Sequence, residues 1–298
     1  MIYEITHKTL YKYSGPVSYC HSKTWLTPRN LSQQRCIQVT FDIKPAPTVF
    51  YDVVDFYGNS VNYFAIQQSH SELVVNVKSR VEVQKNLGMQ LHLNQDLPWL
   101  EVKKMLSEFH EELVDVFHFK YESQHITIDE DIQAYAAKSF TPDRTLLDAS
   151  KDLMHRIFTD FKFVPGYSVI ATPLREIMRS KKGVCQDFAH LAIACIRSQG
   201  LACKYVSGYI ETLPPPGKEK LVGTDASHAW YSVYLPGHGW FDFDPTNNMI
   251  PGDQHIVVAW GRDYSDVTPL RGVILGEGSH KLDVSVDVRR IISEPLSA

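Results

Sequence analysis

Apolar residues in the first third of the chain recur in short runs that alternate as β-strands do. Over residues 2–83, β-branched and aromatic runs such as Val39-Thr-Phe-Asp-Ile43 and Leu73-Val-Val-Asn-Val-Lys78 are separated by turns that contain Pro or Gly. Several short strands at this spacing, with no convincing helix among them, are typical of an antiparallel sandwich. The pattern therefore predicts an N-terminal β-sandwich domain over residues 1–90.

The apolar period changes to that of a helix between about Pro98 and Val116. Residues spaced three or four apart form one helical face there: Val102, Met105, Leu106, Phe109 and Leu113. This spacing predicts helical structure, and similar patterns predict helices over 132–139 and 149–158.

A pattern of one helix followed by strands occupies the region around Cys185. The helix is predicted to run from Cys185 to about Gln199, with Gly200 ending it and a turn at 182–184 preceding it. Strand-like runs follow at 203–210, 226–235, 239–244, 272–275 and 282–292. The chain is thus predicted to be α+β, with residues 91–298 forming a helical segment and a core in which a helix packs on an antiparallel sheet.

Composition and charge narrow the class of protein. The 298 residues are 44% apolar and 21% charged, as in ordinary folded proteins, and the length favours two units. The net charge of -4, with scattered Lys and Arg, argues against nucleic-acid partners. The first residues lack a cationic segment followed by an apolar run, and no stretch approaches the roughly 20 apolar residues that span a bilayer. We expect a cytoplasmic protein without a membrane partner.

The five cysteines are an odd number without CxxC spacing, which favours neither a disulfide framework nor a zinc ribbon: Cys20, Cys36, Cys185, Cys195 and Cys203. Free cysteines are mostly small buried hydrophobes. Cys185 differs because it lies at a predicted helix N-terminus, where the dipole favours a thiolate and the amides can contact an oxyanion. Cys185 is therefore the candidate nucleophile.

The candidate base and acid follow from strand alternation. If residues 235–239 form the turn between two strands, His228 lies diagonal to Asp244 on a shared face, and Asp242 faces Ser232, further from His228. Diagonal partners lie about 7 to 8 Å apart, close enough for a carboxylate to reach an imidazole nitrogen. The geometry favours Asp244 over Asp242 but depends on this inferred register. His228 would then accept the thiol proton, and Asp244 would orient the ring.

At these positions the chain resembles the transglutaminase-like superfamily, in the bacterial branch labelled as cysteine proteases. Four motifs carry the resemblance in order and spacing: Gly183-Val-Cys-Gln-Asp-Phe-Ala-His190, Arg197-Ser-Gln-Gly-Leu-Ala-Cys-Lys-Tyr-Val-Ser-Gly-Tyr209, Ser227-His-Ala-Trp-Tyr231 and Gly239-Trp-Phe-Asp-Phe-Asp-Pro-Thr-Asn247. It extends to an N-terminal β domain, at 9–29 and 55–59, and to a C-terminal signature at 261–269.

The resemblance implies a papain/transglutaminase-like core and a triad at the matching positions, Cys185, His228 and Asp244. The chain departs from animal transglutaminases because it has no Trp between Trp99 and Trp230 to help hold the oxyanion. Tyr167 is a weak alternative donor. No acidic loop resembles a calcium-binding EF-hand, and His110-Glu-Glu-Leu-Val114 lacks the second His of a zinc-protease motif. We expect no metal and no cofactor.

Three functions remain open from the sequence. The first is cysteine-dependent acyl transfer with water as the acceptor, by a peptidase or amidase acting on a peptide or protein amide. The second is transfer to an amine, as in transglutaminases. The third is a non-catalytic binding or scaffold protein, which the intact triad disfavours. The family resemblance favours hydrolysis, while the natural substrate and the oligomeric state are not encoded in any pattern that we identified.

Overall fold

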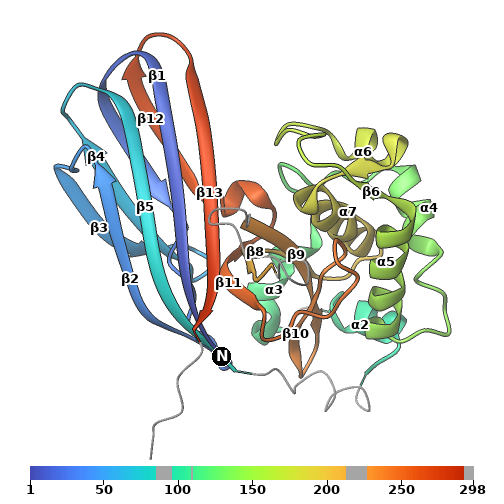
Figure 1. The fold of residues 1–298 in the computed structure, drawn as a ribbon. Helices are drawn as coiled ribbons and strands as arrows, with labels where there is room; N and C mark the ends of the chain where they lie inside the picture. Colours follow the sequence, from blue (N-terminus) through green and yellow to red (C-terminus); the bar gives the residue numbers. More distant parts are fainter. Residues whose placement is uncertain (85–95, 109, 213–226, 292–298) are drawn as a thin grey trace, which may run out of the picture.

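A computed structural model describes residues 1–84, 96–108, 110–212 and 227–291, and confirms the predicted α+β class (Figure 1). Strands from both ends of the chain form a long β structure, while the middle of the chain forms a smaller sheet covered by helices. The β structure consists of β1 (Ile2–Thr24), β2 (Gln34–Lys44), β3 (Val49–Val54), β4 (Ser60–Ile66), β5 (His70–Val83), β12 (Leu270–Gly276) and β13 (His280–Ile291).

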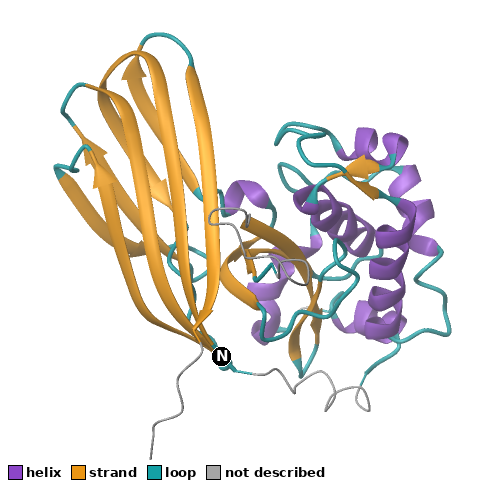
Figure 2. Cartoon of the chain, in the orientation of Figure 1, coloured by secondary structure: helices purple, strands orange, loops and turns teal. Residues whose placement is uncertain are grey.

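The β structure is antiparallel and has two layers, as Figure 2 shows. Residues 2–13 of β1 pair with β5 and β13, whereas residues 17–24 pair with β4 and β12. The long strand β1 therefore crosses from one layer to the other near Gly15, whereas β12 and β13 each pair with one of its two parts. Apolar side chains fill the space between the layers: Val17, Cys20, Ile43, Phe64, Ile66, Leu73, Val75 and Val77.

The two C-terminal strands belong to this sandwich. The sequence pattern predicts a second unit over residues 91–298 that includes these strands, but β12 and β13 hydrogen-bond to β1 along most of its length. Ile2 pairs with Ile291, so the two ends of the described chain lie side by side. Pairing partners that are almost 290 residues apart leave no local signal in the sequence.

Helices cover the second part of the molecule: α2 (Trp99–Met105), α3 (Val114–Phe117), α4 (Glu130–Ala137), α5 (Leu146–Asp160), α6 (Leu174–Ser180) and α7 (Cys185–Ser198), with short 3-10 turns η2 (Glu111–Leu113), η3 (His118–Lys120) and η4 (Tyr264–Asp266). The helical pattern predicted over 98–116 is divided between α2, η2 and α3, and the Ser107 hydroxyl donates to the Lys104 carbonyl just after α2 ends. Phe109 lies outside the described residues. Across the described ranges, no helix is long and apolar enough to span a bilayer.

A four-stranded antiparallel sheet supports α7. It consists of β8 (Cys203–Ile210), β9 (Ser227–Leu235), β10 (Gly239–Phe243) and β11 (His255–Gly261), in the order β10-β9-β8-β11. The sequence analysis did not predict β11. Its run of apolar residues is buried on both faces and therefore lacks the alternation of a half-exposed strand. A two-stranded parallel pair consists of β6 (Lys162–Phe163) and β7 (Lys182–Gly183), and β7 lies where the sequence predicted only a turn.

Two amide side chains of the sandwich hold the edge of this sheet. Gln34 accepts from the Val257 amide and donates to the Val257 carbonyl, at 2.8 and 2.7 Å. Asn59 makes the same pair of bonds to Trp260, at 3.0 and 2.8 Å. The backbone groups of β11 that face away from β8 therefore find partners in the sandwich, which protects an otherwise open strand edge.

Candidate active site

Cys185 is the first residue of α7, at the N-terminus that the sequence predicted. Val184 precedes it in an extended conformation, and its amide donates to the Asp187 carboxylate at 2.8 Å. Asp187 also accepts from the Ser168 hydroxyl, which joins the 164–172 loop to the start of the helix. Burial raises the pKa of the Asp187 carboxyl. This capping fixes the direction in which the first turn of α7 presents Cys185.

The absence of a side chain at Gly183 lets Asp187 and Phe188 pack closely against the backbone before Cys185. A Cβ atom at position 183 would lie 2.9 Å from Asp187 Oδ2 and 3.1 Å from a ring carbon of Phe188. The Gly183 carbonyl accepts from the Val164 amide at 2.9 Å, which completes the link between β6 and β7. The residues before the thiol are thus held by a parallel strand pair and not by a free turn.

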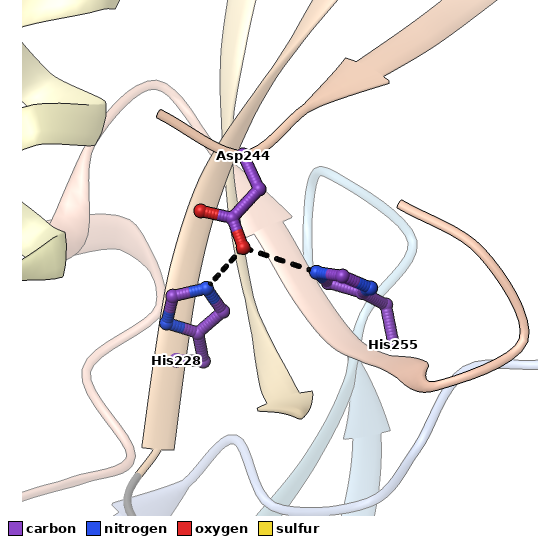
Figure 3. Close-up of side chains that lie close together, drawn as sticks. All are labelled: His228, Asp244 and His255. Atoms are coloured by element: carbon purple, nitrogen blue, oxygen red, sulfur yellow. Dashed lines mark hydrogen bonds and ion pairs between the residues drawn. The ribbon is translucent and has the colours of Figure 1, made fainter. Parts of the chain in front are cut away.

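His228 and Asp244 are in direct contact. The distance between His228 Nε2 and Asp244 Oδ2 is 2.6 Å, and both side chains are buried (Figure 3). The hairpin has the predicted register, because Ser232 pairs with Asp242 and β10 ends just before Asp244. Asp242 is therefore further along the strand from His228, as the sequence geometry indicated.

Cys185 completes the cluster on the other side of the imidazole. Its thiol interacts with His228 and contributes to the raised pKa of that imidazole. Because Asp244 holds Nε2, the second ring nitrogen Nδ1 points away from the carboxylate (Figure 3) and is the one left for the thiol. The structure thus brings together the three residues that the sequence analysis chose.

The electrostatics favour an ionised pair. Burial alone lowers the pKa of His228, but its hydrogen bonds to Asp244 and Cys185 outweigh burial and raise that pKa to about 10. Burial alone raises the pKa of Asp244, but the hydrogen bonds with His228 and His255 hold it well below its ordinary value. At neutral pH, Asp244 is a carboxylate beside a histidine that favours its protonated form.

Asp244 is surrounded by donors that the sequence analysis did not single out. The amides of Thr246 and Asn247 donate to Oδ1 at 2.9 and 3.2 Å. The Asn247 side chain donates to Oδ2 at 2.7 Å, and His255 lies 3.1 Å from the same oxygen. The Asx-turn sequence that follows Asp244 could have indicated the first two donors. His255 had no comparable signal, because it begins the strand that was not predicted.

His228, Asp244 and His255 also form the kind of ligand set that zinc uses, and their donor atoms lie within 4.8 Å of one another. The contacts of 2.6 and 3.1 Å are lengths of hydrogen bonds between nitrogen and oxygen. A metal at about 2.0 to 2.2 Å from each atom would have to replace both bonds. The distances in this cluster are therefore those of hydrogen bonds from the two imidazoles to Asp244, and not those of ligands around a metal ion.

Trp230 packs beside this cluster, with its ring centroid 5.9 Å from that of His228 and 5.2 Å from that of His255. It is fully buried and also packs with Val206 and Val257. Tyr167 is 37% exposed, and the Lys182 ammonium lies 5.8 Å from its ring centroid.

The four remaining cysteines provide an internal reference for thiol reactivity. Cys20, Cys195 and Cys203 are buried, and Cys36 is half-buried on β2. Burial raises the pKa of each of these thiols, to about 12 for Cys195. All four should react slowly as nucleophiles.

The contribution of the His228–Asp244 pair to folding should depend on pH. The raised pKa of His228 means that its stabilisation is fully present below pH 6.5 and is lost as pH rises toward about 10. The lowered pKa of Asp244 means that its stabilisation is present above pH 3.8 and is lost on further acidification.

Urea unfolding of the wild type and of His228→Gln tests this dependence. The difference, or gap, between their free energies of unfolding should be largest near pH 5.5. By pH 10 the gap should shrink by more than about 1.4 kcal/mol. A gap that stays constant or widens with pH contradicts the pairing.

Two family models match the chain. One describes the bacterial transglutaminase-like N-terminal region and matches residues 3–82. The other describes the transglutaminase-like superfamily and matches residues 133–245, a range that contains Cys185, His228 and Asp244.

Relatives and a solved structure share nearly the whole chain. An uncharacterized protein of Mycobacterium tuberculosis is 40% identical over 292 residues, covering 96% of this chain and 92% of the relative. An uncharacterized protein of Mycobacterium leprae is 30% identical over the same length, covering 96% and 98%. The crystal structure of a candidate cysteine protease from Cytophaga hutchinsonii has a TM-score of 0.75 and 18% identity, covering 99% of this chain and 93% of that one. At this low identity, the similarity to the Cytophaga hutchinsonii protein shows a shared fold only.

Proposed function

Because the chain belongs to the transglutaminase-like superfamily, we propose that it catalyses cysteine-dependent acyl transfer on amide bonds, with water as the usual acceptor. The observation that carries the proposal is the direct contact between His228 and Asp244, beside the Cys185 thiol that contributes to the raised pKa of His228. Such an arrangement supplies a nucleophile, a base that becomes an acid, and a carboxylate that orients the base.

In the first half of the proposed reaction, Cys185 Sγ attacks the carbonyl carbon of the amide. The proton of the thiol resides on His228, and the raised pKa of that histidine supports a thiolate–imidazolium pair. The amide C–N bond then breaks, the nitrogen leaves with the proton from His228, and a thioester to Cys185 remains. The first amides of α7 lack intrahelical acceptors and can donate to the oxyanion, which gives a role to backbone groups where this chain has no upstream Trp.

In the second half, the acceptor attacks the thioester. Water gives a carboxylic acid and regenerates the thiol, and His228 accepts the proton of the water. A primary amine gives a new amide by the same steps, so the triad does not decide between acceptors. The absence of a Trp between Trp99 and Trp230 supports hydrolysis.

A peptide library incubated with and without an amine donor, and read by mass spectrometry, tests the proposal. Hydrolysis of the backbone splits a peptide, deamidation of glutamine adds about one mass unit, and transamidation adds the donor minus ammonia. Each change should depend on Cys185 and disappear in Cys185→Ala. Product formation that is equal in the two proteins would refute the proposal.

Alkylation checks the ionised pair without any knowledge of the substrate. Iodoacetamide should label Cys185 well below pH 8, and at pH 6.5 about 10- to 100-fold faster than Cys36, because an ordinary thiol is only about 1% ionised there. His228→Gln should remove most of this advantage. Peptide mapping identifies the labelled residue, and labelling of Cys185 no faster than that of Cys36 would contradict the ion pair.

A further inference from the structure

We propose that His255 is a positioning residue of the candidate triad, which holds Asp244 in the orientation that His228 requires. The inference rests on the proposed function and adds a fourth side chain to its site. His255 comes from β11, the strand at the edge of the sheet, and reaches Asp244 from the side opposite His228 (Figure 3).

The first support is the geometry around one oxygen. Asp244 Oδ2 lies 2.6 Å from His228 Nε2 and 3.1 Å from His255 Nε2, so it bridges the two rings. Oδ1 is occupied by the amides of Thr246 and Asn247. With both oxygens held, the carboxylate cannot rotate about its terminal bond without breaking hydrogen bonds in a buried site.

The second support is the protonation state that this geometry demands. An ionised carboxylate only accepts hydrogen bonds, so His255 must carry its proton on Nε2. His255 Nδ1 is buried and has no hydrogen-bond partner among the described residues. His255 thus acts as a donor through Nε2, whereas His228 is the ring that exchanges a proton with the thiol in the proposed reaction.

The packing keeps His255 in this role. Its side chain is 2% exposed, and the Trp230 ring meets it edge to face with 5.2 Å between centroids. The Trp230 ring in turn lies over Gly208, where a Cβ atom would come within 2.5 Å of the indole. His255 therefore contacts Asp244, which lies just beyond the end of β10, and packs against His228 and Trp230 of β9.

The backbone of β11 is itself fixed by the sandwich. Gln34 and Asn59 each bind β11 through two hydrogen bonds, at Val257 and Trp260. His255 lies two residues before the first of these contacts, and its amide donates to Gly252 at 3.1 Å. The orientation of Asp244 therefore depends on a strand that the N-terminal domain holds in place.

The experiment compares His255→Gln, which keeps an amide donor at the reach of Nε2, with His255→Leu, which removes it. Kinetics on a substrate found in the library should show kcat reduced about 10- to 100-fold in His255→Leu, with KM changed less than about threefold, because a hydrogen bond to a charged group is lost. The bell-shaped pH profile of kcat/KM should narrow on both limbs, since the ion pair is less stabilised. The rise of Cys185 alkylation with pH should move to higher pH for the same reason. His255→Gln should recover most of kcat and both pH profiles.

The outcomes separate this inference from the proposed function. A wild type without turnover and with unreactive Cys185 refutes the proposed function itself. An active wild type with unchanged kcat and pH profiles in His255→Leu overturns the role of His255. Equal losses in both variants, with an unchanged pH profile of the residual activity, show a structural role only and also overturn it. If His255→Leu does not fold, His255→Asn, which is too short to reach Asp244, should show the same losses relative to His255→Gln.

Discussion

Replacing Cys185 with alanine is expected to lower turnover of the amide substrate by at least about 10⁴-fold, the largest effect of any single substitution in this chain. No other described thiol contacts His228, so no side chain in this site can replace the nucleophile. Cys185 is only partly buried, and the free energy of unfolding should change by less than about 1 kcal/mol. Initial rates and urea unfolding, measured on the same preparation, separate the two effects.

Cys36→Ala is the matched control for this substitution. Cys36 is also half-buried and unpaired, but it lies on β2 of the sandwich. Its loss should leave turnover within about twofold of the wild type. A Cys185→Ala protein that keeps even one hundredth of the activity would exclude Cys185 as the nucleophile.

Replacing Asp244 with asparagine is expected to lower kcat by about 10³- to 10⁴-fold. The amides of Thr246 and Asn247 must keep an oxygen at the Oδ1 position, so the new NH₂ group falls where Oδ2 now accepts from His228. His228 Nε2 can then only accept, and its proton moves to Nδ1, which presents an N–H instead of a lone pair to Cys185.

Asp242→Asn controls for the chemistry of the same substitution. Asp242 lies two residues earlier and pairs with Ser232, away from His228. Its kcat should stay within about threefold of the wild type. An equal loss in the two variants would mean that the carboxylate adjacent to His228 is not what the reaction requires, and steady-state kinetics on both proteins decide this.

The sequence predicted those parts of the fold and site that have a local signature. The helix that begins at Cys185 follows an apolar period and ends near Gly200, and the structure places it at Cys185–Ser198. The β9–β10 hairpin has the predicted register because its turn is short, so the pairing of Ser232 with Asp242 follows from counting residues. The position of Asp244 diagonal to His228 follows from that register, which the sequence supports only if residues 235–239 form the turn.

The parts that escaped prediction depend on contacts between distant segments. His255 approaches Asp244 only because β11 adds to the far edge of β8, and a strand buried on both faces has no alternating pattern. Likewise, β12 and β13 read as ordinary strands, and nothing in their own residues indicates that β1 is their partner. Periodicity gives the type of an element but not its partner.

The pairing of β1 with β12 and β13 has a consequence for the order in which the molecule can form during synthesis. A ribosome synthesises β1 well before β12 and β13, so one side of β1 has no partner until residues 270–291 have emerged. Residues 185–261, which contain α7 and the strands around the candidate site, are synthesised earlier and pair over short distances. The sandwich that secures β11, and through it His255, is therefore the last part able to close, and the site should reach its final geometry only when the C-terminal strands are in place.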